Sequence, residues 1–252
     1  MGDNLVKIIS SNDITKEVKK LCIDANLYLG KDVTDSIKSN IHKEENILGR
    51  DILNILLENA NIAKEKSIPI CQDTGMAVFF VKLGQEIYIE GSTIEEAINE
   101  GVRQGYEEGY LRKSVVHPIT RVNTKDNTPA VIHYEIVKGD KLTIEFAPKG
   151  FGSENMSKLK MLKPSDRIDG IKNFIIDTVK EAGLNPCPQI VVGVGIGGTV
   201  MHQGIRVLFY KEKNMIEIKT PINSEEIRNL KCGDYVSLSG IIYTARDASH
   251  KS

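Results

Sequence analysis

The sequence lacks any marked excess of charge of one sign. Its 33 lysine and arginine residues nearly balance 34 aspartate and glutamate residues, so the formal net charge is −1. Proteins that bind nucleic acid or membrane surfaces usually present a basic face to the phosphate groups of their partner. The balanced charge therefore predicts neither nucleic acid nor membrane as a partner.

Cysteine and long apolar runs are also scarce. Four cysteines in 252 residues, with no repeated short spacing, do not make a disulfide framework, so we expect a reduced, cytoplasmic setting. No apolar run approaches the roughly 18 residues that suggest a membrane span. The stretch from Met1 to Leu5 shows no positive region followed by an apolar core, and we expect no signal peptide.

The region before Pro69 has the pattern of helices. Apolar residues recur there every three or four positions, in three stripes, and the first stripe starts behind a predicted N-cap at Asp13. Cys22 lies beside the first stripe and is predicted to be a core residue. The stripes are Ile14, Val18, Leu21, Ala25 and Leu29; Val33, Ile37 and Ile41; and Ile52, Leu53, Leu56, Leu57, Ala60 and Ala63.

The remainder alternates between strand and helix patterns. Ser92 with Glu95 predicts a capping box for a helix that runs to about Gly109. Ser165 is predicted to cap a later helix, which Gly183 ends. Strands are predicted at 76–83, 86–90, 130–137, 141–147 and 190–192, with the third and fourth paired as a hairpin. We therefore predict an α+β fold: an N-terminal helical region, a mixed α/β body and a short β-rich C-terminal segment.

Two isolated cysteines stand in loops bounded by proline. Cys71, in the motif Cys71-Gln72-Asp73-Thr74-Gly75, follows Pro69, and Cys187 stands between two prolines ahead of a glycine-rich run from Gly193 to Thr199. Thiolates in such loops are typical ligands of a soft metal centre such as an iron–sulfur cluster. The alternative is that both cysteines are small buried side chains.

Other polar segments have two interpretations each. Arg112 is either a ligand-binding cation or a favourable charge at a helix C-terminus. The polar loop 121–129 is either functional or a solvated connection, and the glycines of residues 149–155 can bring backbone N–H groups close to an anion. Residues 193–198 also fit the dinucleotide pattern G-x-G-x-x-G, but residues 200–210 have little helical period, which weakens that alternative.

Taken together, these segments resemble a known family, the class I, iron–sulfur-dependent fumarate hydratases and tartrate dehydratases. Four motifs occur in the order and spacing of the α subunit of the two-subunit form, from near the start of the chain to about Thr199. The matching motifs are Cys71-Gln72-Asp73-Thr74-Gly75; Arg121 with Asn123-Thr124 and Asp126-Asn127-Thr128-Pro129-Ala130; Lys149 to Asn155; and Asn185-Pro186-Cys187-Pro188 leading into Gly193 to Thr199.

The C-terminal part resembles a different subunit of the same family. From Met215 onward, the sequence resembles the beginning of the β subunit. The resemblance therefore implies a truncated α-subunit-like domain at residues 1–199, a junction at 200–214 and the start of a β-subunit-like domain at 215–252. The family's third cluster cysteine has no counterpart here; His202 stands as a remnant near its place, and Cys232 matches no ligand position.

The resemblance also implies a function. It implies a hydro-lyase that reversibly hydrates a small dicarboxylate, such as fumarate to malate, as a homo-oligomer or with a partner subunit. It implies a [4Fe–4S] cluster held by Cys71 and Cys187, with Asp73 as a catalytic residue. The implied substrate-binding residues are Gln72, Arg112, Gly152 and Arg246. The alternative is a catalytically inactive truncated fusion or subunit fragment without a stable cluster.

Overall fold

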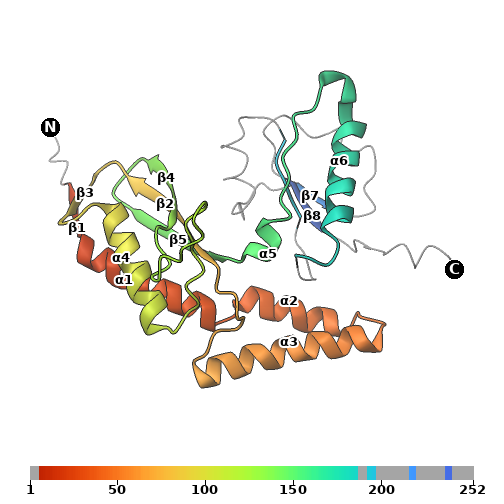
Figure 1. Cartoon of the computed structure of the whole chain (residues 1–252), viewed down its shortest axis with the longest axis horizontal. Helices are drawn as coiled ribbons and strands as arrows, with labels where there is room; N and C mark the ends of the chain where they lie inside the picture. The colour runs from red at the N-terminus through yellow and green to blue at the C-terminus, as the bar shows by residue number, and fades with distance from the viewer. Residues whose placement is uncertain (1–5, 187–191, 197–215, 220–235, 240–252) are drawn as a thin grey trace. The chain divides into compact units, whose positions relative to one another are not determined.

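The computed structural model describes residues 6–186, 192–196, 216–219 and 236–239, and the contacts within the chain define two compact units, residues 1–151 and 152–252. The first unit contains β1 (Lys7–Ser10), α1 (Ser11–Leu27), α2 (Lys31–Ile41), α3 (Ile47–Lys66), β2 (Met76–Gly84), β3 (Ile87–Glu90), α4 (Ile94–Glu108), β4 (Val131–Val137) and β5 (Leu142–Lys149) (Figure 1). The later elements are α5 (Phe151–Glu154), a 3₁₀ turn (Pro164–Asp166), α6 (Arg167–Ala182), β6 (Gly193–Val194), β7 (Ile216–Lys219) and β8 (Val236–Ser239). The predicted α+β class is confirmed.

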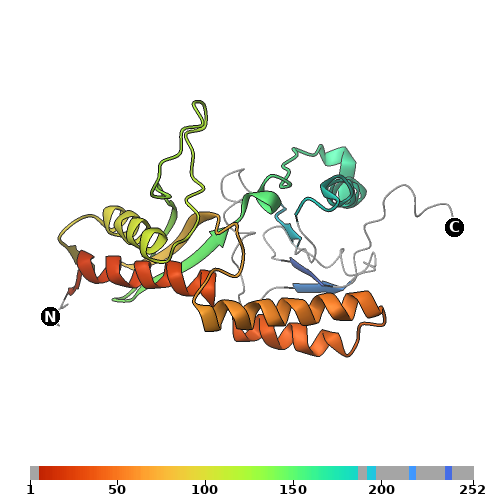
Figure 2. The ribbon, with the colours of Figure 1, turned by 60° about the horizontal axis from the view of Figure 1, so that its bottom comes forward.

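Helices α1 and α4 lie side by side and cover one face of the sheet formed by β2, β4 and β5 (Figure 2). Their close approach depends on two glycines of α4. A Cβ atom at Gly101 would lie 2.6 Å from Cγ1 of Val18, and one at Gly105 would lie 2.8 Å from Cβ of Cys22. Cys22 is fully buried in this contact, which confirms its predicted place in the core.

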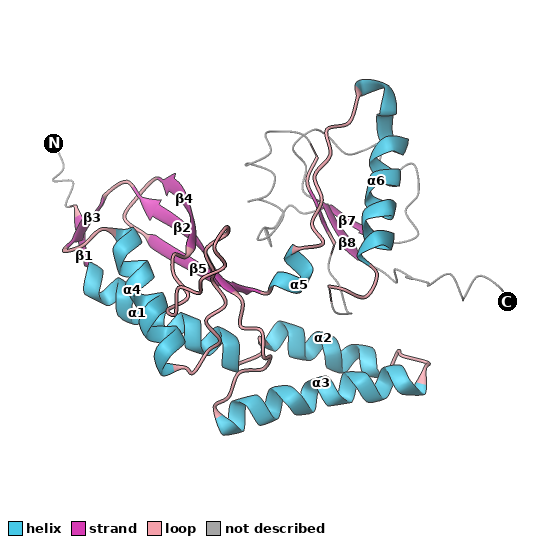
Figure 3. Cartoon of the chain, viewed as in Figure 1, coloured by secondary structure: helices cyan, strands magenta, loops and turns pink. Residues whose placement is uncertain are grey.

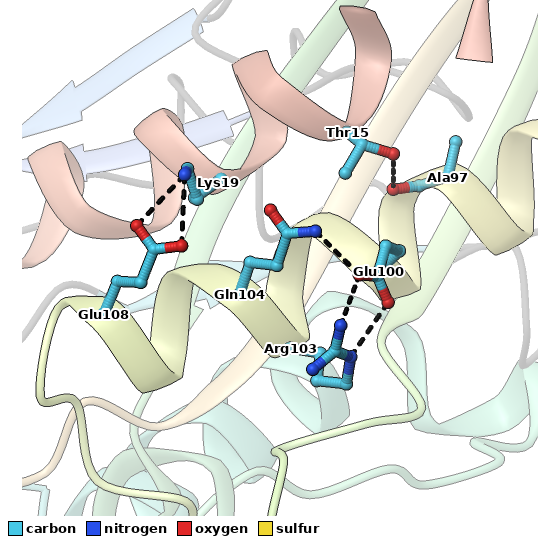
Figure 4. A network of polar contacts seen from close by, with 7 residues as sticks. All are labelled: Thr15, Lys19, Ala97, Glu100, Arg103, Gln104 and Glu108. Carbon is cyan, nitrogen blue, oxygen red and sulfur yellow. Dashed lines mark hydrogen bonds and ion pairs between the residues drawn. The ribbon is translucent and has the colours of Figure 1, made fainter. Parts of the chain in front are cut away.

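Polar contacts line the edge of the same helix pair (Figure 4). The hydroxyl of Thr15 donates to the carbonyl oxygen of Ala97 at 3.0 Å, and Lys19 pairs with Glu108 at 3.0 Å. Glu100 accepts from Arg103 on the outer side of α4. These contacts help to fix the orientation of α1 relative to α4. The stability of the helix pair comes mainly from its buried apolar residues.

Strand β2 is the centre of the three-stranded sheet, whose order is β4-β2-β5 (Figure 3). It runs parallel to β4, with Phe79 opposite Ile132, and antiparallel to β5, with Phe79 opposite Phe146. The predicted hairpin between residues 130–137 and 141–147 is therefore wrong. Strand β2 takes the central place because its residues are apolar on both faces, whereas β4 is partly exposed along its length.

The N-cap residues of α1 and α4 differ from the predicted ones. Ser10, rather than Asp13, caps α1, and its hydroxyl accepts a backbone hydrogen bond of 3.3 Å. The capping box of α4 is made by Thr93 and Glu96, one residue later than the pattern starting at Ser92 predicts. Each cap satisfies backbone N–H groups that have no partner within the helix.

Helices α2 and α3 pack against each other but bury little. No residue of α2 is buried, and α3 buries Leu53 and Ala63 alone. Six large aliphatic side chains of α3 are 37–70% exposed: Ile47, Leu48, Ile52, Ile55, Leu56 and Ile62. We call this set the α3 apolar surface.

The second unit combines α6 with a small sheet of order β6-β8-β7. Helix α6 buries Val179 and Ala182 and ends at Gly183, as predicted, where a positive φ of 54° favours glycine. It starts after Asp166 and a 3₁₀ turn, so the predicted cap at Ser165 is wrong. The predicted strand at 190–192 falls almost wholly outside the described residues.

In the part of the chain that the structure describes, no helix is long and apolar enough to cross a membrane.

Candidate functional site

Residues 71–75, the Cys71 loop, connect α3 to β2. The preceding residue, Ile70, is fixed on both sides: its N–H donates to the carbonyl oxygen of Asn26 at 2.9 Å, and its carbonyl oxygen accepts from the side-chain amide of Asn59 at 2.9 Å. Cys71 itself is exposed and its thiol is free. The loop therefore presents an accessible sulfur atom from a backbone that is held in place.

The two described cysteines have opposite environments. Cys22 is buried, and this burial raises the pKa of its thiol to about 12. A thiol in such a site stays protonated and cannot serve as a metal ligand or nucleophile at neutral pH. Cys71, being exposed, meets the accessibility that a ligand needs. The structure thus agrees with the sequence in separating a core cysteine from a candidate ligand.

Asp73 and Gly75 fix the shape of the Cys71 loop. One carboxylate oxygen of Asp73 accepts from the N–H of Gly75 at 3.1 Å, and the other accepts from the N–H of Phe151 at 3.3 Å. Gly75 has a φ of 67°, and a Cβ atom there would lie 2.4 Å from the carbonyl carbon of Lys149. The loop and the end of β5 are therefore in direct contact, and that contact requires glycine at position 75.

Residues 111–115, the Arg112 segment, also contact the Cys71 loop. The buried hydroxyl of Thr74 donates to the carbonyl oxygen of Arg112 at 3.1 Å. Leu111 is buried and anchors the start of the segment, while the side chain of Arg112 is exposed. The structure thus brings the backbone of two predicted site segments together, 38 residues apart in the sequence.

Two buried residues to which the sequence analysis assigned no individual role hold this arrangement. The hydroxyl of Tyr106 donates to the carbonyl oxygen of Thr74 at 3.0 Å. Asn127 is completely buried, and its side chain contacts both Gly75 and the end of the Arg112 segment. Asn127 belongs to the polar loop 121–129, for which the sequence left open a functional or a solvated interpretation. No simple spacing rule distinguishes it from its polar neighbours.

The described structure does not test the place of the predicted site residues beyond the first unit. Gly152 follows Phe151 and begins the second unit. Cys187 and Arg246 lie outside the described residues, as do His202 and Cys232. Within the described residues, no group of three or more His, Cys, Asp or Glu side chains is arranged to hold a metal ion.

A separate open hollow of about 510 Å³ lies along α4 and the residues next to Asn127. Four of its lining residues are carboxylates and one is a cation; they are Glu95, Glu96, Glu100, Asp126 and Arg103. Burial works against ionisation of Asp126, but hydrogen bonds from the N–H and hydroxyl of Thr128 outweigh it and lower the pKa of the carboxyl. An anionic ligand would meet repulsion there, so this hollow is a poor match for a dicarboxylate.

Comparison with known proteins gives one consistent result. A family model described as fumarate hydratase (fumerase) matches residues 15–231. The chain is 42% identical over 224 residues to a protein of Methanocaldococcus jannaschii named "Putative L(+)-tartrate dehydratase subunit alpha", covering 86% of this chain and 78% of that protein. It is 30% identical over 196 residues to the L(+)-tartrate dehydratase subunit alpha of Escherichia coli strain K12, covering 75% of this chain and 63% of that one. The chain thus spans less than two thirds of the bacterial relative.

Proposed function

Since this chain belongs to the fumarate hydratase family of hydro-lyases, we propose that it takes part in the reversible hydration of a small dicarboxylate, such as fumarate to malate. The observation that carries the proposal is the contact between the Cys71 loop and the Arg112 segment through Thr74. It supports a site in which an exposed thiol and a cation come from adjacent segments. The names of the relatives, L(+)-tartrate dehydratase subunit alpha, support L-tartrate as a second substrate to test.

A [4Fe–4S] cluster is the cofactor that we propose, with Cys71 and Cys187 as two of its ligands. Of the two described cysteines, Cys71 alone fits, because it is exposed while Cys22 is buried and protonated. When bound, the cluster would supply a Lewis-acidic iron next to the substrate hydroxyl. The sequence has no match for the family's third cysteine ligand, which supports a labile cluster and leaves the inactive fragment as the alternative function.

The proposed protein groups act by orientation and charge. The Asp73 carboxylate is held by two backbone N–H groups, each oxygen accepting one, and both oxygens retain acceptor capacity for a catalytic role. We propose that Gln72, Gly152 and the two arginines bind the substrate carboxylates. Arg112 and Arg246 suit this role because a guanidinium group pairs with a carboxylate through two parallel hydrogen bonds.

The decisive experiment measures iron, acid-labile sulfide and hydratase activity after anaerobic reconstitution of the purified chain. We expect iron and sulfide in the wild-type chain and their loss in Cys71→Ala, with Cys22→Ala as the matched control that retains them. For the chain assayed without a partner subunit we expect weak dicarboxylate binding and turnover about 10²–10⁴-fold below that of an assembled enzyme. A partner subunit can supply a positioned acid or base, and losing one commonly costs that much in rate. A cluster that survives Cys71→Ala would contradict the ligand assignment.

We also propose that the chain acts as a homo-oligomer or with a partner subunit, in the cytoplasm. The α3 apolar surface supports association, because large exposed apolar patches commonly mark protein–protein contacts. Sedimentation of the wild type should give a species larger than one chain, and Ile52→Lys with Ile55→Lys should shift it toward the monomer. A monomeric wild type, with no change in the double variant, would count against association through α3.

A further inference from the structure

Both polar atoms of the Asn127 side-chain amide have hydrogen-bond partners, although the residue is completely buried. It is 0% exposed, and its Oδ1 accepts from the N–H groups of Ser114 at 2.7 Å and Val115 at 3.2 Å. Its Nδ2 donates to the carbonyl oxygen of Gly75 at 3.1 Å. Its backbone has a φ of 63°, a conformation that asparagine adopts more readily than most residues.

These contacts join the two segments of the proposed site. Ser114 and Val115 belong to the Arg112 segment, and Gly75 is the last residue of the Cys71 loop. An amide is one of the few side chains of this size that can accept at one end and donate at the other. Aspartate would lose the donor, and alanine would lose both ends and leave buried backbone groups without partners.

We propose that Asn127 is a positioning residue, which fixes the Cys71 loop against the Arg112 segment so that the proposed cluster ligand Cys71 and the substrate-binding guanidinium of Arg112 are held at the same site. The proposal rests on the function proposed above. Positioning matters for such a site because a displacement of about 1 Å can reduce the rate on the order of 10²-fold. Asn127 does not contact the substrate; it acts through the two segments that it joins.

The first test uses hydrogen exchange of the chain without cluster or substrate. In Asn127→Asp the acceptor oxygen remains, so the amides of Ser114 and Val115 should stay protected. The carbonyl oxygen of Gly75 loses its donor, so the end of the Cys71 loop should open more often. The N–H of Gly75, which donates to Asp73, should therefore exchange about tenfold faster. In Asn127→Ala the N–H groups of Ser114 and Val115 lose their acceptor as well, so these two amides should exchange faster together with that of Gly75. Equal protection of Gly75 in the wild type and Asn127→Asp would overturn the proposal.

A matched control comes from Asn99, whose side chain has the same kind of partners. Its Oδ1 accepts from the N–H of Ala130 at 2.9 Å, and its Nδ2 donates to the carbonyl oxygen of Glu95 at 3.0 Å. Asn99→Asp therefore makes the same chemical change away from the Cys71 loop. It should leave exchange at Gly75 unchanged.

The second test measures binding of L-tartrate and of fumarate by calorimetry. We expect Asn127→Asp to weaken binding by about tenfold, and Asn99→Asp to leave it unchanged at a comparable Tm. Wild-type affinity in Asn127→Asp would show a merely structural role and overturn the positioning role. If the wild type binds neither ligand, the proposed function fails, whereas the exchange pattern still confirms or overturns the coupling of the two segments.

Discussion

In the first unit, the α1–α4 pair and the α2–α3 pair differ in how much apolar surface they bury. Both pairs carry apolar residues at helical spacing. The α1–α4 contact encloses fully buried side chains such as Val18 and Ile98, whereas α3 leaves Ile47 and Leu48 more than 60% exposed. The difference arises because small residues of α4 let α1 approach and both helices pack on the sheet. Within the described residues of the first unit, α2 and α3 contact chiefly each other. Helical periodicity predicts which face is apolar, but a partner is needed to bury it.

The largest expected difference between the two pairs comes from removing one aromatic ring from the α1–α4 core. Phe79 is fully buried beneath these helices, so Phe79→Ala should lower the free energy of unfolding by about 3–5 kcal/mol. Ile55 of α3 is 60% exposed, and Ile55→Ala should change the free energy of unfolding by less than about 1 kcal/mol. Denaturant unfolding of both variants measures the two changes in unfolding free energy. Equal losses of stability would show that the two helix pairs do not differ in packing.

Glycine-to-alanine substitutions test how closely the helices of each pair pack. An added methyl group at Gly101 would lie 2.8 Å from the backbone oxygen of Thr15, so Gly101→Ala should destabilise the protein by about 1–3 kcal/mol. At Gly49 of α3 the methyl group meets the flexible side chain of Glu44, which can move aside. Gly49→Ala should therefore keep or raise the Tm, since alanine favours helix. A stabilising Gly101→Ala would mean that α1 and α4 are less tightly packed than the distances indicate.

A smaller effect should appear at high pH through Cys22. Burial raises the pKa of its thiol to about 12, whereas the unfolded thiol ionises near its usual value. Below the unfolded pKa both states are protonated, so stability is unaffected. As pH rises from about 9 to 10, the unfolded state loses protons first, and the free energy of unfolding should fall by up to about 1.4 kcal/mol.

Cys22→Ala should remove this dependence, while Cys71→Ala, at an exposed position, should keep it. Burial also raises the pKa of Tyr106, so the comparison is best confined to pH values near 9–10. An unchanged pH dependence in Cys22→Ala would assign the effect to another group. Unfolding curves of the three proteins across this range provide the measurement.

The sequence predicted most elements of the fold and missed how some of them pair. Periodicity located α1, α2 and α3, and the capping-box pattern located α4, to within a few residues, because helical contacts are local in sequence. The hairpin error had a physical cause: two strands joined by a short turn usually pair, but here the apolar β2 occupies the place between them. Which strands pair depends on which of them takes the buried central place in the sheet. Residue patterns within a short segment of sequence do not contain that information.

For the candidate site, the sequence indicated motifs but not the residues that hold them. Cys71 and Asp73 stand in a recognisable motif, and the structure places them in one loop with two backbone donors to the carboxylate. Asn127 and Tyr106 were missed because their importance follows from full burial and from partners far along the chain. The assignments of Cys187 and Arg246, and the β-subunit-like origin of residues 215–252, stay predictions.

The central place of β2 has a consequence during synthesis of the protein. Its apolar residues leave the ribosome before either neighbouring strand exists, and at about 5–20 residues per second they wait several seconds for β4 and β5. Helix α4 is made within that interval, and α1 is already complete. Both helices are thus complete before β4 and β5, and they are available to pack against Phe79 and its neighbours in the nascent chain.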